Sequence, residues 1–309
     1  MRKRPLVLLS FFSLLAFWGS GFLAIRIGLE GFPPFLFMAA RFLLAGTLLM
    51  AFLAARRTPL PTARQWPGVF IEALLLMVGG GGGVAYAQLS IGSGLAAVGI
   101  ATVPIWAALF AGYFGRWPNR TEWAGIAIGF SGVLLLNLRG ELRADPRGAL
   151  LLFTSAVTWA LGSILSRRLP LPGGAMAAAS EMVVGGLMLV FLGIVAGERI
   201  PAPPSLRSVM GLLYISIAGS LVAFSAYLYL LQNVSPALAT SYTYINPAIA
   251  LGLGVLVAGE HVSFTELAAV AGILCGVAVI VLGQGTPREA FSNPGRAPFP
   301  SESGPGGPG

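Results

Sequence analysis

Two charged residues, Arg41 and Glu181, stand inside otherwise apolar segments and could do chemistry away from water. A charged side chain at the centre of a bilayer costs roughly 2.5–3.5 kcal/mol on insertion scales, so it usually faces a cavity or a partner. An arginine there could hold an anionic group, and a glutamate could bind and release a proton. Glu72 lies closer to the edge of its apolar segment, where reaching toward the headgroups is a sufficient explanation.

Arg41 and Glu181 occupy equivalent positions when AARFLLAG is aligned with ASEMVVGG. Opposite charges at related positions favour an ion pair between two halves of the chain. A second interpretation keeps them separate, with Glu181 as a proton-coupling site and Arg41 as an anion-binding group. A third has both extending toward the headgroups.

Aromatic and amide side chains form a second group of candidates. A cavity for amphipathic small molecules needs flat apolar faces and a few orienting hydrogen-bond groups. An interfacial aromatic belt or ordinary packing is the alternative. Tyr227 and Tyr229 lie about 200° apart on a helix, so at most one points inward. The candidates for substrate binding are Trp18, Tyr86, Gln88, Trp106, Trp159, Tyr242 and Asn246.

Five consecutive glycines, Gly79 to Gly83, interrupt the apolar run LLLMVGGGGGVAYAQL. No Walker A lysine follows them, so a phosphate loop is excluded. They leave every face of a helix bare for more than a turn. Close packing is one interpretation, and a wide, pliable stretch beside a cavity, with Gly80 in its wall, is the other.

Pro104 and Pro247 lie at matching positions in the middle of two apolar segments. Each removes a helical hydrogen bond, so a kink is expected in both segments. Such kinks could act as hinges.

The segments that position these residues are transmembrane helices. The chain has 309 residues, of which 56% are hydrophobic and 10% charged, with a mean hydropathy of +0.83. Apolar stretches of about 20 residues recur along it, the length of a membrane-spanning helix. We predict an all-α polytopic membrane protein with ten spans, near residues 6–27, 34–55, 68–89, 94–115, 121–138, 148–166, 175–196, 208–231, 237–258 and 264–283.

The arrangement of positive charge favours cytoplasmic N- and C-termini. With this orientation the cytoplasmic side holds twelve Arg and Lys residues and the opposite side six. Residues 285–309 are rich in Pro, Gly and Ser and are predicted to be a disordered cytoplasmic tail.

The sequence also repeats itself. WGSGFLAIR resembles WALGSILSR, and the segments around Pro104 and Pro247 align, as do those around Gly132 and Gly276. Residues 1–141 and 142–284 are therefore predicted to be two five-helix halves. An odd number of spans gives the halves opposite orientations in the membrane, which is an inverted repeat with a cavity between its halves.

These motifs, with SGLAAVGIATVPIW and SPALATSYTYINPAIALGLGVLVAGE, resemble the EamA-type branch of the drug/metabolite transporter superfamily over residues 6–283. The resemblance implies a ten-helix carrier in the bacterial inner membrane that moves small organic metabolites by alternating access. In the family pattern Asn often stands where this chain has Gly80, and the site of Gln88 is commonly acidic or amide. The glycine removes a polar group from the predicted cavity wall, so the resemblance does not extend to the substrates of close relatives.

Other function classes lack the residues they need. His261 is the only histidine and Asp145 the only aspartate, which disfavours a metal site, a hydrolase and other enzymes. The arginines sit in short clusters between spans, which excludes a nucleic-acid surface. We expect no cofactor. The leading hypothesis is a secondary active exporter of amino acids or xenobiotics, with the lipid bilayer and, under one interpretation, protons as its other partners. A passive facilitator or channel is the alternative, and the sequence predicts no oligomeric state.

Overall fold

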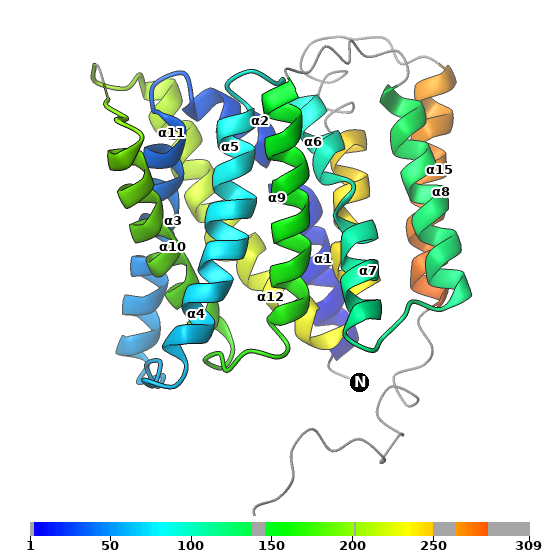
Figure 1. Cartoon of the computed structure of the whole chain (residues 1–309), viewed down its shortest axis with the longest axis horizontal. Coiled ribbons are helices and arrows are strands. Elements are labelled where there is room, and N and C mark those ends of the chain that lie inside the picture. The colour runs from blue at the N-terminus through cyan, green and yellow to red at the C-terminus, as the bar shows by residue number, and fades with distance from the viewer. Residues whose placement is uncertain (1–2, 138–145, 201, 250–263, 284–309) are drawn as a thin grey trace, which may run out of the picture.

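The chain folds into a bundle of helices that run side by side (Figure 1). The computed structural model describes residues 3–137, 146–200, 202–249 and 264–283. Within these ranges all regular secondary structure is helical. The second part of the predicted span 237–258, His261, Asp145, the boundary between the predicted halves and the tail 285–309 lie outside them.

In its described residues, the first half of the chain contains eight α-helices and one π-helix. They are α1 (Lys3–Gly19), α2 (Gly21–Gly28), α3 (Pro34–Ala55), α4 (Trp66–Glu72), η1 (Ala73–Gly82), α5 (Gly83–Ala87), α6 (Ser93–Ile100), α7 (Val103–Tyr113) and α8 (Arg120–Asn137).

The second half repeats this pattern. Its described elements are α9 (Pro146–Leu165), α10 (Ala175–Val195), α11 (Leu206–Tyr214), η2 (Ile215–Phe224), α12 (Ser225–Asn233), α13 (Pro236–Thr240) and α15 (Phe264–Gly283). Residues 242–249 are also helical.

Seven helical stretches in the described ranges are long and apolar enough to cross a membrane. They are Pro5–Gly28, Pro34–Ala55, Trp66–Ala87, Ala96–Tyr113, Pro146–Leu165, Ala175–Val195 and Leu206–Asn233. Each corresponds to one of the ten predicted spans. Two further predicted spans coincide with α8 and α15, and the apolar part of α15 is the shorter stretch Leu267–Ile280. The count of ten spans therefore stays a prediction.

The π-helices were not predicted, and they occupy equivalent positions of the two halves. Each continues an α-helix, α4 or α11, for ten residues before α-helix resumes in α5 or α12. π-Helices are rare, and they occur mostly as single turns at functional sites. A ten-residue π-helix at related positions therefore distinguishes the third and eighth predicted spans from the other described spans.

Helices from related positions of the two halves pack against each other and run antiparallel. α3 lies against α10, and α8 lies against α15 (Figure 1). Along α3 and α10, Gly46 contacts Met182 and Val183, whereas Gly193 contacts Leu36 at the opposite end. The direction along α8 and α15 is also opposite, since Gly125 contacts Ile280 and Gly132 contacts Ile273.

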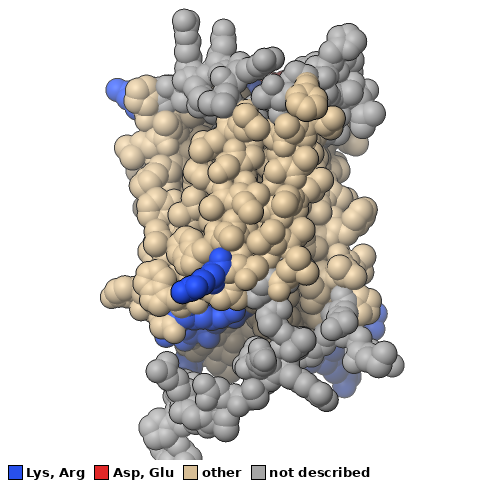
Figure 2. Space-filling model, turned by 90° about the vertical axis from the view of Figure 1, so that its right-hand side faces the viewer, with Lys and Arg blue, Asp and Glu red and all other residues tan. Residues whose placement is uncertain are grey.

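Glycines allow the backbones of α8 and α15 to approach closely. A Cβ added to Gly276 would lie 2.3 Å from the backbone nitrogen of Gly129. Small residues spaced by four positions are typical of tightly packed membrane helices, because van der Waals contact drives their association there. On this side of the molecule Figure 2 shows a broad band of uncharged residues, with Lys and Arg gathered near its lower part. This surface suits contact with lipid.

Candidate functional site

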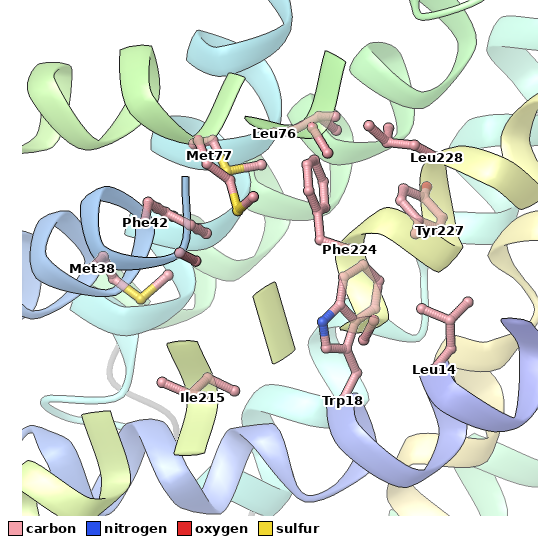
Figure 3. Close-up of a cluster of buried hydrophobic side chains, with 14 of the residues drawn as sticks. Leu14, Trp18, Met38, Phe42, Leu76, Met77, Ile215, Phe224, Tyr227 and Leu228 are labelled. Atoms are coloured by element: carbon pink, nitrogen blue, oxygen red, sulfur yellow. The ribbon is translucent and has the colours of Figure 1, made fainter. Parts of the chain in front are cut away.

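A cavity lies between the two halves, with about 90 Å³ of solvent-accessible volume. That is room for several water molecules or a small group of a ligand. Its wall is mainly apolar and draws on both halves of the chain. Six of the predicted site residues line it: Trp18, Arg41, Gly80, Trp159, Tyr242 and Asn246. In Figure 3, Trp18 and Phe224 face Met38, Phe42 and Met77 across this region.

Four aromatic rings form one wall of the cavity and its backing. The Trp18 ring lies edge-on to Trp159, with centroids 5.4 Å apart, and contacts Tyr242 at 5.0 Å and Tyr227 at 5.3 Å. Tyr227 in turn contacts Trp159 at 5.5 Å and Tyr242 at 5.6 Å. Edge-to-face aromatic pairs contribute about 0.5–1.5 kcal/mol each beyond burial. The wall is therefore a rigid cluster, contributed by α1, α9, α12 and the helix at 242–249.

The two tryptophans are fixed by different hydrogen bonds. Trp18 Nε1 donates to the carbonyl of Gly219 in η2 at 2.8 Å. Trp159 Nε1 donates to the Tyr227 hydroxyl at 3.0 Å, and this hydroxyl also bonds to Ser163 Oγ at 2.5 Å. Ser163 Oγ donates back to the Trp159 carbonyl. The second tryptophan thus belongs to a closed chain of side-chain hydrogen bonds.

Each of the five glycines meets a different neighbouring side chain. A Cβ on Gly79 would lie 2.7 Å from Thr158, and one on Gly80 would lie 2.4 Å from the Trp159 ring. The corresponding neighbours of Gly81, Gly82 and Gly83 are Met38, Leu189 and Ser155, all closer than 3.0 Å. Because side chains of α3, α9 and α10 all pack against this stretch, close helix packing accounts for all five glycines. Gly80 and Gly81 also line the cavity.

Arg41 and Glu181 do not pair in the structure. Arg41 lies on the cavity wall, donates from Nε to Ser220 Oγ at 2.8 Å and stacks over the Phe42 ring at 4.8 Å. Glu181 is fully buried, and its carboxyl oxygens have no hydrogen-bond partner in the described part of the chain. Arg41 points toward η2 instead, through its hydrogen bond to Ser220. The ion-pair and proton-coupling interpretations of these two residues both stay predictions.

Three predicted residues lie away from the cavity. Tyr86 is 41% exposed and packs on Phe35, with centroids 5.2 Å apart. Trp106 meets Phe153 edge-on at 5.3 Å. Gln88 is fully buried just past the end of α5, and its backbone carbonyl accepts a hydrogen bond from Arg26. The structure does not bring these three together with the aromatic wall.

The two prolines differ in their place relative to the helix breaks of their segments: Pro104 lies at the break, and Pro247 lies inside the helix that follows it. α6 ends at Ile100, and Pro104 lies in the first turn of α7, where a missing N–H costs nothing. In the related segment α13 ends at Thr240, and helix resumes at 242–249 with Pro247 buried inside it. A hinge role stays a prediction for both residues.

Sequence reasoning missed or misjudged several residues around the cavity. Glu72 does not reach toward the headgroups as predicted, since it is fully buried at the junction of α4 and η1. Tyr227 is fully buried, in agreement with the expectation that only one of Tyr227 and Tyr229 faces inward. Phe224 and Ser220 had no signal in the sequence, because the π-helix alters the face on which they lie.

Residues 5–138 and 146–282 each match the EamA-like transporter family, one copy for each half of the chain. The chain belongs to this family. The resemblance predicted from the sequence motifs is thereby confirmed. Among the described residues, no group of three or more His, Cys, Asp or Glu side chains is placed to hold a metal ion.

Two of the three relatives compared below are named as transporters. The chain is 42% identical over 287 residues to the uncharacterized inner membrane transporter YedA of Escherichia coli K12, which covers 92% of this chain and 94% of YedA. It is 27% identical to the uncharacterized transporter YdfC of Bacillus subtilis, over 84% of this chain and 86% of YdfC. The chloroplastic WAT1-related protein At3g02690 of Arabidopsis thaliana is also 27% identical, over 87% of this chain and 68% of that protein.

A solved crystal structure shares the fold. It superposes with a TM-score of 0.75 over 90% of this chain and 98% of its own, at 22% sequence identity. This likeness shows the fold alone. The family match and the similarity to YedA place the chain in a family of membrane transporters.

Proposed function

We propose that this protein is a secondary active transporter that exports small organic metabolites across the bacterial inner membrane by alternating access. The observation that carries the proposal is the cavity between the halves, where the repeat-related residues Trp18 and Trp159 meet. Ligand sites of transporters built from repeats typically lie at such an interface.

The proposed architecture has ten spans arranged as two inverted five-helix halves. The antiparallel packing of α3 on α10 and of α8 on α15 supports it, since equivalent spans of inverted halves must run in opposite directions. The loops on the side of the two termini hold more Arg and Lys than the loops on the opposite side, which supports cytoplasmic termini. Rocking of one half against the other would open the cavity to each side in turn.

The cavity wall supports an amphipathic substrate with a flat apolar body and an anionic group. Trp18, Trp159 and Tyr242 offer apolar faces. Arg41 uses one guanidinium N–H on Ser220 and a second on the Met38 sulfur, and keeps the others for a ligand, because guanidinium has five N–H donors. The Asn246 side-chain oxygen is buried and has no partner among the described residues, so it could accept from an ammonium group. Amino acids with apolar side chains fit this set of groups.

Two arginines at equivalent positions of the halves support a gating role at opposite ends of the bundle. Arg26, at the end of α2, donates to the Gln88 carbonyl at 2.5 Å, just beyond α5. Arg167, at the end of α9, donates to the Val234 carbonyl between α12 and α13. The loop that carries Arg167 lies beside Gly68, at the start of the third predicted span, because the Pro170 carbonyl approaches Gly68. Equivalent bonds at opposite ends are what alternating access requires.

The experiment has two stages. Thermal-shift measurements on the purified protein against a library of amino acids and aromatic xenobiotics identify a stabilising solute. Counterflow in proteoliposomes then uses that solute in radiolabelled form. A transporter shows accelerated uptake of label when unlabelled solute is loaded inside. Uptake that is unaffected by internal solute would support the passive facilitator or channel, and the proposal of alternating access would fail.

A further inference from the structure

Two carboxyl groups that the proposed substrate site does not use are buried in the protein. Glu72 and Glu181 are both fully buried, and all four carboxyl oxygens lack a hydrogen-bond partner in the described residues. An isolated ionised carboxylate in such surroundings costs many kcal/mol, so the group takes up a proton instead. Two of them in one region call for an explanation.

Helix packing brings the two carboxyl groups together. α10 contacts both α4 and η1. A Cβ on Gly185 would lie 2.4 Å from Met77 and 3.6 Å from Ala73. Gly82 contacts Leu189 farther along, so the helices run in the same direction. Glu181 lies one turn before Gly185, and Glu72 directly precedes Ala73 and lies five residues before Met77. They therefore lie at the same depth, and their charges interact.

Within the part of the chain that the structure describes, no cation forms an ion pair with either carboxyl group. Of the charged and titratable groups on packed elements, Tyr227 on α12 interacts electrostatically with Glu72 and with Arg167 at the end of α9. Arg41 on α3 is bonded to Ser220. In the described residues the ion pairs are those of Arg116 with Glu122 and of Arg207 with Glu30, and neither involves this region.

We propose that Glu72 and Glu181 together form a proton-binding site that couples the proton gradient to substrate export. The inference rests on the proposed transport function and adds its driving ion. Two carboxylates that repel each other in a dry region cannot both stay ionised, so the pair holds a proton until water or a conformational change reaches it. A metal ion is disfavoured because two carboxyl groups alone provide too few oxygen ligands.

The charge of Glu72 acts on Tyr227 through space, without a hydrogen bond between the two residues. The Tyr227 hydroxyl accepts the Trp159 N–H. Trp159 lines the cavity. A change of charge at Glu72 therefore changes the electrostatic potential at the hydrogen-bond chain of Tyr227, Ser163 and Trp159, which holds one wall of the substrate site.

The proposed cycle only moves a proton. When the pair faces the outside, a carboxylate oxygen forms an O–H bond with a proton taken from water. After the halves rock, the same O–H bond breaks and the proton passes to water on the cytoplasmic side. Substrate moves outward in the opposite step. No oxidant, reductant or other reactant is required.

The first test needs no substrate. The thermal stability of the purified protein is measured between about pH 5 and pH 9. A native state that holds a proton which the unfolded chain releases loses stability as the pH rises. The Glu72→Gln/Glu181→Gln double variant mimics the protonated pair and is expected to lose most of this dependence. Glu30→Gln, at an exposed ion pair, is the control and should behave like wild type. A double variant with the pH dependence of wild type would overturn the proposal, as would stability that follows sodium concentration instead of pH.

The second test uses proteoliposomes and the solute identified by thermal shift. With one proton exchanged for one substrate, a pH difference of about one unit sustains at most a tenfold substrate gradient. Wild type should approach this gradient. Glu72→Gln and Glu181→Gln should build none, yet keep counterflow within about twofold of wild type, because exchange needs no net proton movement. Glu181→Asp keeps a titratable group and should retain part of the gradient.

The outcomes separate the two proposals. If wild type transports nothing but the Gln variants lose the pH-dependent stability, the proton site stands and the transport function fails. If counterflow is normal and the Gln variants still build the pH-driven gradient, the transport function stands and the proton site is wrong.

Discussion

Trp18 and Trp159, which occupy equivalent positions in the two halves, meet edge to face with ring centroids 5.4 Å apart and an angle of 79° between the planes. Their indole N–H groups nevertheless bond to different acceptors, the Gly219 carbonyl and the Tyr227 hydroxyl. The duplicated fold therefore places two copies of one residue at its centre, and the differences between the halves give them separate roles. One tryptophan is held by η2, and the other by a side-chain network.

Replacing Trp18 with Phe should destabilise the protein and weaken substrate binding. The substitution keeps an aromatic ring but leaves the buried Gly219 carbonyl without its donor, which costs about 1–3 kcal/mol. Thermal melting and the substrate-induced shift in melting temperature measure the two effects. Trp106→Phe is the matched control, because that ring packs on Phe153 away from the cavity. Equal losses in both variants would contradict a special role for Trp18.

Replacing Gly80 with Asn should change which solutes bind. A Cβ there would lie 2.4 Å from Trp159 Cε3, so the indole must move and the cavity wall must change shape. Overpacking of this kind costs about 1–3 kcal/mol. The thermal-shift library measures the new solute preference. Gly92→Ala is the control, because no atom lies within 4 Å of the added Cβ. An unchanged solute ranking in Gly80→Asn would argue against a place for Gly80 in the substrate site.

Replacing Arg41 with Ala should weaken binding of anionic solutes by about 10- to 100-fold, since a hydrogen bond to a charged group contributes about 1.5–3 kcal/mol. Arg41→Lys keeps the charge but not the planar geometry, and should recover part of the loss. The double variant with Glu181→Gln tests whether the two residues interact. Because they do not pair, their effects on stability should add. A large coupling energy between Arg41→Ala and Glu181→Gln would instead support the ion-pair interpretation.

Sequence patterns were sufficient for the repeat, the helical class and the family, because each depends on residue type and spacing alone. The cavity wall at Trp18, Trp159 and Tyr242 was also predicted, since these residues flank repeat-matched motifs. The hydrogen bond of Arg41 to Ser220 and the burial of Glu72 were not predicted. The positions of these residues depend on which helix face turns inward, and the π-helices shift that face by an amount that hydrophobic periodicity does not reveal.

The same limit explains Tyr86 and Trp106. Aromatic residues in membrane helices serve both cavities and lipid contacts, and residue type alone does not separate these uses. Tyr86 is exposed on the surface of the described structure, and Trp106 packs against Phe153. Only the direction of the side chain distinguishes them from Trp159.

Replacing Gly276 with Leu should separate α8 from α15. Even a Cβ at this position would lie 2.3 Å from the Gly129 backbone, which cannot move aside without displacing the helix. We expect a large loss of thermal stability. Gly272→Ala is the control, because its Cβ would lie 3.6 Å from the Gly132 Cα, an ordinary contact. A Gly276→Leu protein as stable as this control would show that the two helices do not depend on close contact.

The bonds of Arg26 to Gln88 and of Arg167 to Val234 lie at opposite ends of the bundle. Removing one should make the cavity more accessible from one side of the membrane, and removing the other should make it more accessible from the opposite side. Each bond contributes about 1 kcal/mol, so its loss changes the ratio of the two open states by about fivefold. A Ser155→Cys reporter in the cavity wall, made in a Cys275→Ser background, measures access by labelling with a membrane-impermeant maleimide from each side. Arg167→Ala should increase labelling from the cytoplasmic side, and Arg26→Ala labelling from the opposite side. If both variants increased labelling from the same side, the two bonds could not be equivalent gates of an inverted repeat, because inversion places equivalent contacts on opposite surfaces of the membrane.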